Sequence, residues 1–382
     1  MQQRHVIFRG AAMAVFVAAF AAHANAEVAE RVVYRDEQQQ QRTIEGRLLV
    51  EAADGGVMLQ SADGAITTIP AEQLVQRSKL DAEFRPLTAD EVGAQLKQEF
   101  GERFKITRTN HYVICSDAGD AYAEWCGALL ERLYAGFENY WKYRKFDLAK
   151  PEFPLTAIVF ARQPDFAAYA TADAGPETAT AKGYYSLKTN RVVLYDLSGN
   201  KSNRGARNAA EINRRMAQTP FNTATVVHEA THQIAFNRGL HTRYADNPLW
   251  FTEGMAMFFE TPDLRSRSGW RTIGKINPFR RNQLAKSKRL HTPGALRSLI
   301  ESDAQLLDPE TAEDAYAVSW ALTYFLLKTR GDRYAEYLES LASKKPLRFG
   351  TPEERVTEFQ AAFGDDLGKL EQEWQRFMQR TK

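Results

Sequence analysis

Two short segments of the chain carry residues whose types and spacing suit a catalytic metal ion. The first runs from His228 to His232 with Glu229 second, and the second places Glu253 in an apolar stretch. Because positions four apart share one face of a helix, His228 and His232 can direct their imidazoles at one ion. Glu253, on a second helix, would complete a set of two imidazoles and one carboxylate and leave a fourth position open for water. Glu229 could reach that water, so the pattern predicts hydrolytic chemistry at Zn²⁺.

The flanking sequence predicts that both segments are buried helices. Apolar residues surround the two histidines, and Glu253 is the only carboxylate between Leu249 and Phe259. Burying two imidazoles and a carboxylate without partners would cost on the order of several kcal/mol, which a bound metal ion would remove. The competing interpretation is a buried helix whose histidines bond to the backbone or to neighbouring carboxylates, but the complete set favours the metal site. Gly254, beside Glu253, would let the two helices approach closely.

At these residues the chain resembles the gluzincin metallopeptidases, which are zincins whose third ligand is a glutamate on a downstream helix. It is similar in particular to an uncharacterised bacterial family of exported proteins with peptidase MA-like domains. The resemblance implies that His228, His232 and Glu253 bind zinc and that Glu229 is the general base. It also implies an α+β, zincin-like metallopeptidase domain over residues 104–382, with a mixed α/β lobe followed by a helical lobe.

The resemblance implies a further catalytic role for Tyr316. In aminopeptidase N-like members of the group, a tyrosine well downstream of the glutamate ligand donates a hydrogen bond to the oxyanion. Tyr316 opens a long apolar helical stretch at a comparable place, although a core tyrosine with a satisfied hydroxyl is the alternative. His241, between the two metal segments, is a weaker candidate, and we expect it to be an exposed loop histidine.

The chain departs from the gluzincins at two places. It lacks the Gly-Ala-Met-Glu-Asn type of segment with which aminopeptidase N-like enzymes hold a free amino terminus, which argues against aminopeptidase activity. Thermolysin-like enzymes also place an aspartate one turn after the glutamate ligand, where it orients a histidine, whereas Met257 occupies that position here. The group that orients a ligand histidine must therefore come from another part of the chain.

The expected activity is hydrolysis of peptide bonds in a peptide or protein, with endopeptidase cleavage favoured. In zincins a sheet edge beside the site commonly holds an extended peptide, and the strand at 191–195 is the best candidate for that edge, although an ordinary sheet strand is the favoured alternative. Two alternatives remain open. One is a zinc-bound, non-catalytic module that binds a peptide or cell-wall component, and the other is a zinc amidase that acts on a non-peptide or peptidoglycan amide. Glu229 favours an enzyme, because a binding module has no chemical need for a base beside the metal.

The first 26 residues have the pattern of a secretory signal peptide. Arg4 and Arg9 form a basic start, the apolar run that follows is too short to span a membrane, and a small-x-small cleavage site ends at Ala26. A periplasmic or secreted product without stable membrane insertion is therefore expected. Removing this segment takes the formal net charge from +2 to zero, which gives no electrostatic case for binding nucleic acid.

The remaining chain divides into three predicted regions. Residues 27–80 alternate polar and apolar side chains between Gly-containing turns, which predicts a small, SH3-like, β-barrel-like module. Residues 81–103 form a linker with a helix, and residues 104–382 form the metallopeptidase domain. Cys115 and Cys126 could pair as a disulfide in an exported protein or remain buried thiols, and the sequence does not separate these outcomes. Nothing in the sequence fixes the oligomeric state.

Overall fold

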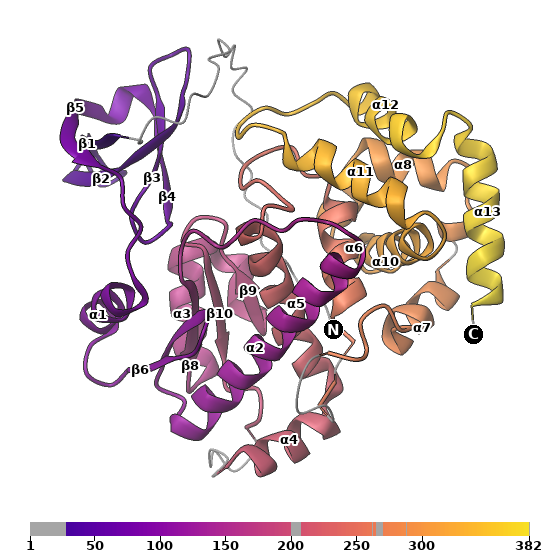
Figure 1. Cartoon of the computed structure of the whole chain (residues 1–382), viewed down its shortest axis with the longest axis horizontal. Coiled ribbons are helices and arrows are strands. Elements are labelled where there is room, and N and C mark those ends of the chain that lie inside the picture. Colours follow the sequence, from indigo (N-terminus) through magenta and orange to yellow (C-terminus); the bar gives the residue numbers. More distant parts are fainter. Residues whose placement is uncertain (1–27, 200–207, 262, 265–269, 288, 382) are drawn as a thin grey trace.

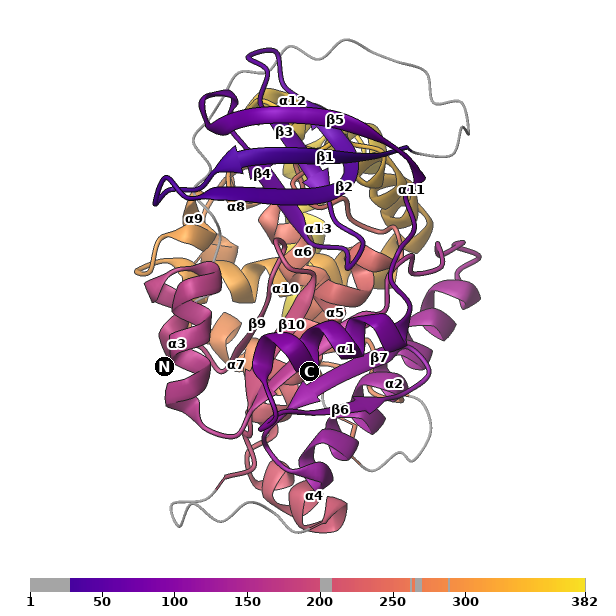
Figure 2. The same ribbon diagram turned by 90° about the vertical axis from the view of Figure 1, so that its left-hand side faces the viewer.

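The computed structural model describes residues 28–199, 208–261, 263–264, 270–287 and 289–381. Over these residues the protein is an α+β structure with two five-stranded sheets and thirteen α-helices (Figure 1). One sheet forms an N-terminal β module, the second belongs to a mixed α/β lobe, and the later helices pack into a helical lobe (Figure 2). No described helix is long and apolar enough to cross a membrane.

The β module is an open antiparallel sheet. Its strands are β1 (Val28–Arg35), β2 (Gln41–Glu51), β3 (Val57–Gln60), β4 (Ile66–Ile69) and β5 (Leu74–Glu83), in the order β4-β3-β2-β1-β5. The expected barrel is wrong in one respect, because β4 and β5 stay at opposite edges of the described sheet and do not pair. The residues of β5 are mostly exposed, and the small core beneath the sheet contains only four buried apolar side chains. That core supplies little apolar area to draw the two edges together.

The β module contacts the α/β lobe at the turn that follows Tyr185. The backbone N–H of Ile66 donates to the carbonyl of Lys188 at 2.7 Å, so part of the β4 edge is covered by this turn. Arg243 donates to the carbonyls of Gly64 and Leu187 and so links the module to the same turn. The module therefore braces a segment that leads directly to the metal centre described below.

The α/β lobe has three layers. Its elements are α1 (Ala89–Phe100), β6 (Lys105–Arg108), β7 (Tyr112–Ser116), α2 (Asp120–Tyr143), β8 (Leu155–Phe160), α3 (Gln163–Ala174), β9 (Gly183–Tyr185) and β10 (Arg191–Tyr195). Alternate strand residues face opposite sides: Ile114 packs with the core of α2, whereas Val113 and Cys115 pack with α1 and α3. The sheet is thus buried on both faces, which explains its nearly continuous apolar strands.

The strand considered as the sheet edge lies inside the sheet. The order is β6-β7-β8-β10-β9, and β10 pairs in parallel with β8 and antiparallel with β9. The candidate edge role of 191–195 is therefore wrong, the alternative of an ordinary sheet strand is confirmed, and the edge belongs to the short strand β9. Sequence alone did not reveal this, because chain order does not fix which neighbour a crossover strand joins.

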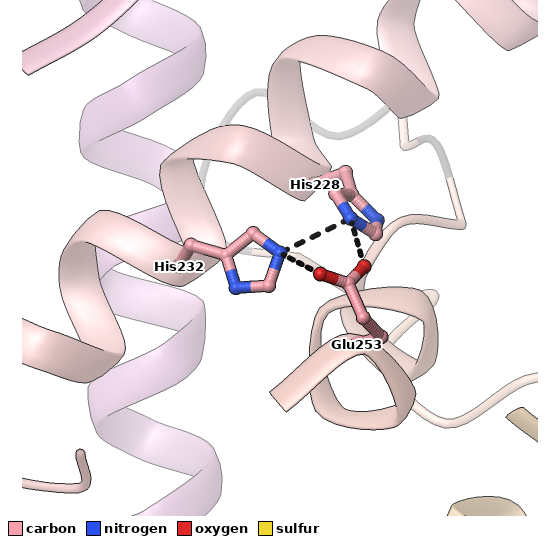
Figure 3. Close-up of side chains that lie close together, drawn as sticks. All are labelled: His228, His232 and Glu253. Carbon is pink, nitrogen blue, oxygen red and sulfur yellow. Dashed lines mark hydrogen bonds and ion pairs between the residues drawn. The ribbon is translucent and has the colours of Figure 1, made fainter. Parts of the chain in front are cut away.

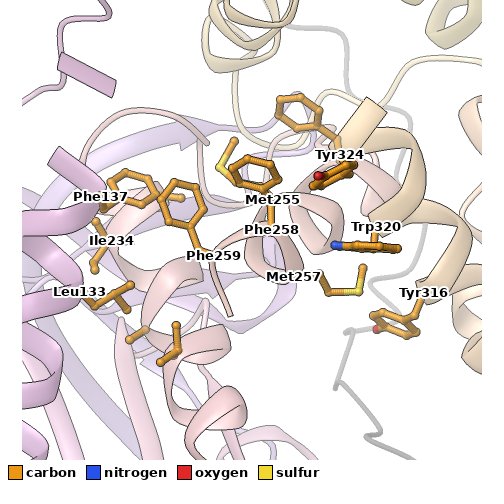
Figure 4. Close-up of a cluster of buried hydrophobic side chains, with 14 of the residues drawn as sticks. Leu133, Phe137, Ile234, Met255, Met257, Phe258, Phe259, Tyr316, Trp320 and Tyr324 are labelled. Atoms are coloured by element: carbon orange, nitrogen blue, oxygen red, sulfur yellow. The ribbon is translucent and has the colours of Figure 1, made fainter. Parts of the chain in front are cut away.

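The helical lobe surrounds an extensive apolar core. Its helices are α4 (Ala209–Gln218), α5 (Pro220–Asn237), α6 (Leu249–Phe259), α7 (Pro278–Lys286), α8 (Ala295–Glu301), α9 (Ala304–Leu307), α10 (Ala312–Thr329), α11 (Gly331–Ala342), α12 (Pro352–Phe363) and α13 (Leu367–Arg380). Phe258 and Phe259 of α6 lie between the side chains of α2 and α10 (Figure 4). Thr351 and Glu354 form a capping box at the start of α12, where they exchange side-chain and backbone hydrogen bonds. Helix α6 is consequently enclosed by other helices.

Both cysteines are buried free thiols. Cys115 lies in the core beside α1 and α3, whereas Cys126 lies in the core on the other face of the sheet. Burial raises the pKa of Cys115 to about 12, which leaves its thiol protonated and unreactive at neutral pH. Of the two outcomes left open by the sequence, the structure has the free thiols.

Candidate metal centre

Three side chains that could hold a metal ion meet between α5 and α6. His228 and His232 come from α5, Glu253 comes from α6, and all three are buried. Nε2 of His232 lies 3.2 Å from Nε2 of His228 (Figure 3). The Glu253 carboxylate lies 3.1 Å from His228 Nε2 and 3.4 Å from His232 Nε2. The three sequence-predicted ligands are therefore brought together by the fold.

The separations between these ligand atoms fit a small tetrahedral ion. Ligands held about 2.0–2.1 Å from a tetrahedral zinc ion lie about 3.3 Å from one another. The two imidazole nitrogens lie 3.2 Å apart, near that value, and the Glu253 carboxylate approaches them with different oxygens, Oε2 at 3.1 Å from His228 and Oε1 at 3.4 Å from His232. Two imidazole nitrogens and a carboxylate buried at these distances form a donor set that a cation stabilises.

Side-chain hydrogen bonds hold α5 against the sheet. Gln233, the residue after His232, donates its amide to the carbonyls of Thr156 and Asn190 at 2.9 and 2.8 Å. Thr156 belongs to β8, and Asn190 immediately precedes β10. Because Gln233 is fully buried, these bonds fix the depth and rotation of the helix that carries both histidines.

A glycine contact sets the distance between α6 and α10. A Cβ atom at Gly254 would lie 2.0 Å from Thr323 Oγ1 and 2.9 Å from the Ser319 carbonyl oxygen, both on α10. Only a residue without a side chain permits this approach. The prediction that Gly254 lets the two metal-binding helices approach closely is wrong in its partner, because Gly254 faces α10 and not α5.

Buried charges hold the start of α6. The Asp303 carboxylate accepts a hydrogen bond from the backbone N–H of Leu249, the first residue of α6, at 2.9 Å. Arg355 of α12 donates to Asp303 at 2.9 Å and also to Asp246, whose carboxylate is almost fully buried. Burial favours a higher pKa for Asp246, but Arg355 and Lys344 outweigh it and lower the pKa below the ordinary value. The ligand helix is thus anchored at its first turn by the C-terminal helices.

Glu260 orients the first ligand histidine. Its carboxylate lies 2.8 Å from Nδ1 of His228, the ring nitrogen that faces away from the ligand cluster. Arg280 and Asn277 donate to the other Glu260 oxygen at 2.9 and 2.7 Å. A carboxylate that binds the outer nitrogen of a metal-ligating histidine fixes the ring orientation and raises its basicity. Glu260 therefore orients His228 with its carboxylate, which the thioether side chain of Met257 could not do.

The sequence contained one signal for Glu260 that the motif analysis did not use. Glu260 follows Glu253 by seven positions, which is two helical turns, so both carboxylates emerge on the same face of α6. Glu260 also follows two phenylalanines and is buried with only 3% of its surface exposed. The side chains of Arg280 and Asn277, which make its burial possible, come from a segment whose position the sequence does not indicate.

Burial and neighbouring charges shift the pKa values of His228 and Glu229. Burial disfavours the charged imidazole of His228, but its hydrogen bonds to Glu253 and Glu260 outweigh burial and raise its pKa to about 10. Burial raises the pKa of Glu229 to about 7. Glu229 also accepts a hydrogen bond from the backbone N–H of Tyr185 at 3.0 Å, which places its carboxyl group beside the edge strand β9.

Tyr316 and His241 are both buried near the cluster. Burial, reinforced by the negative charges of Glu253 and Glu229, raises the pKa of the Tyr316 hydroxyl well above its ordinary range. The guanidinium carbon of Arg280 lies 5.9 Å from the centre of the Tyr316 ring. The expectation for His241 is wrong: only 3% of it is exposed, and its ring packs between the rings of Phe236 and Phe251.

Residues 222–348 match a family described as "Protein of unknown function (DUF1570)". The matched segment contains the residues of the ligand cluster, Glu260 and Tyr316. No curated protein matches the chain. The similarity therefore covers the part of the chain that builds the centre and leaves the β module outside.

Proposed function

We propose that the chain is an exported zinc-dependent peptidase that cleaves internal bonds of peptides or proteins. The observation that carries the proposal is the spacing of two imidazoles and one carboxylate around a point suited to zinc, with Glu229 beside them. A structural zinc site is normally closed by four protein ligands, whereas three ligands leave a position for water. Export is proposed from residues 1–26, which lie outside the described residues.

The side chains around the ligand cluster suit the steps of amide hydrolysis. Zinc, when bound, would lower the pKa of a water molecule and polarise a carbonyl group. The Glu229 carboxylate accepts the proton of the attacking water and returns it to the leaving amine. The Tyr316 hydroxyl keeps its proton, because its pKa is raised, and so can donate a hydrogen bond to the developing oxyanion.

The sheet beside the cluster supports a peptide as the substrate. In β9, Tyr184 pairs with Val193 of β10, so the backbone groups of Gly183 and Tyr185 alternate toward the open edge. The hydrogen bond from Tyr185 to Glu229 shows that this edge faces the cluster. An extended peptide could pair with β9 and present a carbonyl to Glu229, which is the arrangement of zincins. A non-peptide amide without an extended backbone would not use this edge.

The proposal is tested by metal content and peptide cleavage measured on the same preparation. The expected result is about one zinc per chain and cleavage of a mixed peptide library, with the products identified by mass spectrometry. Glu229→Gln should keep zinc and lose cleavage, whereas His232→Ala should lose zinc. Cleavage that survives Glu229→Gln would remove Glu229 as the base. Zinc without cleavage would favour the binding module or the amidase, and absence of zinc would refute the proposal.

A further inference from the structure

Lys182 immediately precedes the edge strand β9 and directs its side chain toward the start of α5. Its Nζ atom donates to Asn222 Oδ1 at 2.6 Å and lies 4.7 Å from the centre of the Phe221 ring. Both partners belong to the first turn of α5, the helix that carries the ligand histidines. The ammonium group therefore lies on the same side of the sheet as the metal centre.

The position of this ammonium group is fixed by its neighbours. Asn222, which accepts from Lys182, donates to the Leu197 carbonyl at 2.9 Å and to Thr219 Oγ1 at 3.2 Å. Phe221 in turn packs against Phe279, whose ring is 41% exposed. A lysine held by an amide and an aromatic face loses little further freedom when it binds a ligand.

Lys182 lacks an acidic partner. Among the described residues, its contacts are the Asn222 amide and the Phe221 ring, and no carboxylate lies within ion-pair distance. The first turn of α5 contains no acidic side chain either. Burial lowers the pKa of Lys182, and no neighbouring carboxylate opposes that shift. The buried Arg191, by contrast, is paired with Glu99 at 2.7 Å.

The edge strand fixes where a substrate would meet this charge. Lys182 precedes Tyr185 by three positions, roughly 10 Å along an extended chain at about 3.3 Å per residue. Tyr185 contacts Glu229 and so marks the point where the scissile bond would lie. In antiparallel addition, which is slightly the more stable pairing, the residues that follow the scissile bond run toward Lys182.

We propose that Lys182 is a specificity-determining residue that binds a carboxylate about three residues C-terminal to the scissile bond. The inference rests on the proposed peptidase function, and it names the substrate class as peptides with an acidic group at that distance. That group is either an Asp or Glu side chain or the free C-terminal carboxylate of a short peptide. Asn222 and Phe221 hold the ammonium in place to receive it.

The test compares peptides that differ only at this position. The bond cleaved by the wild-type protein is first located in a peptide library, and fluorescent peptides are then made with Glu, Gln or Lys three residues after it. A further pair ends at that residue with a free or an amidated carboxyl group, which separates a side-chain carboxylate from a terminal one. Cleavage is measured with wild-type protein, and binding is measured by fluorescence anisotropy with zinc-loaded Glu229→Gln.

The Glu peptide should be bound and cleaved roughly two- to fivefold better than the Gln peptide, the range of a partly exposed ion pair. Lys182→Met should abolish the preference, and Lys182→Glu should transfer it to the Lys peptide. Lys188→Glu, a charge reversal at an exposed lysine of the adjoining turn, should leave the preference unchanged. Zinc content and melting temperature confirm that each variant is folded.

Cleavage without any preference, or a preference that survives Lys182→Met, would overturn the inference and leave the peptidase intact. Absence of any cleaved bond in the library would remove the peptidase proposal before the peptides that test Lys182 are made. The two ideas therefore fail separately.

Discussion

Replacing Gly254 with alanine should damage both stability and metal binding. The new Cβ would lie 2.0 Å from Thr323 Oγ1 and 2.9 Å from the Ser319 carbonyl oxygen, whereas nonbonded heavy atoms normally stay about 3.5 Å apart. Thr323 can rotate, but the Ser319 carbonyl belongs to the backbone of α10, so the two helices must separate. Overpacking of this kind costs about 1–3 kcal/mol, offset by up to about 1 kcal/mol from the better helix propensity of alanine.

The expected net loss is therefore about 1–2 kcal/mol in the free energy of unfolding. Urea denaturation of the metal-free protein, followed by tryptophan fluorescence, measures it. Because the displaced helix also carries Glu253, zinc affinity should fall by at least about tenfold in a competition titration with a chromogenic chelator. A core defect elsewhere would lower stability and leave zinc affinity unchanged. A loss of both stability and zinc affinity would therefore connect the packing of Gly254 with the position of Glu253.

Gly331→Ala is the matched control. Gly331 begins α11, and a Cβ atom there would meet nothing within 4 Å, so this variant should keep its zinc affinity. Adding Thr323→Ala to Gly254→Ala should restore part of the lost stability, because it removes the nearer contact and leaves the carbonyl contact in place. If Gly254→Ala matched Gly331→Ala in both measurements, the argument that Gly254 sets the spacing of the ligand helix would be refuted.

Three further perturbations test other parts of the centre. Glu260→Gln should weaken zinc binding by roughly 10- to 100-fold, because the orientation of His228 is lost, while the exposed, ion-paired Glu301→Gln should change nothing in the same chelator titration. Tyr316→Phe should lower kcat roughly 10²-fold or more without changing zinc content, as loss of an oxyanion donor does, and unchanged kinetics would leave Tyr316 a core residue. Asp246→Asn should destabilise the protein at pH 7, but by less than the about 3–5 kcal/mol of a fully broken buried pair, because Arg355 keeps its ion pair with Asp303. Because the folded-state pKa of Asp246 is lowered, this difference between wild type and variant should persist down to its ordinary pKa of 3.8 and shrink as the pH falls further. A difference that grew on acidification in urea titrations across this range would contradict that assignment.

Local features of the chain were predictable because they depend on short-range physics. The helix at Ala89–Phe100 and the strand at Leu155–Phe160 follow from capping residues and apolar runs that lie within a few positions of each other. The spacing of His228 and His232 similarly fixes their common helix face. The ligand cluster was therefore accessible from sequence, since two helical segments suffice to define it.

Features that depend on which segments meet were not accessible. The placement of β9 rather than β10 at the sheet edge follows from strand pairing across a long connection. The open edge of the β module follows from how little apolar surface its core contains and from the turn that covers part of β4. Neither property has a local signature in the residues concerned.

The sequence by itself determined which side chains could bind a metal ion, because side-chain chemistry and helical periodicity are properties of residues close together in the chain. Only the tertiary structure decided what surrounds it. Arg280 and Asn277 make Glu260 a partner for His228, β9 brings Tyr185 to Glu229, and α5 presents Asn222 to Lys182. Each of these contacts joins segments whose encounter is fixed by the packing of the whole core, and packing energy is summed over contacts distant in sequence.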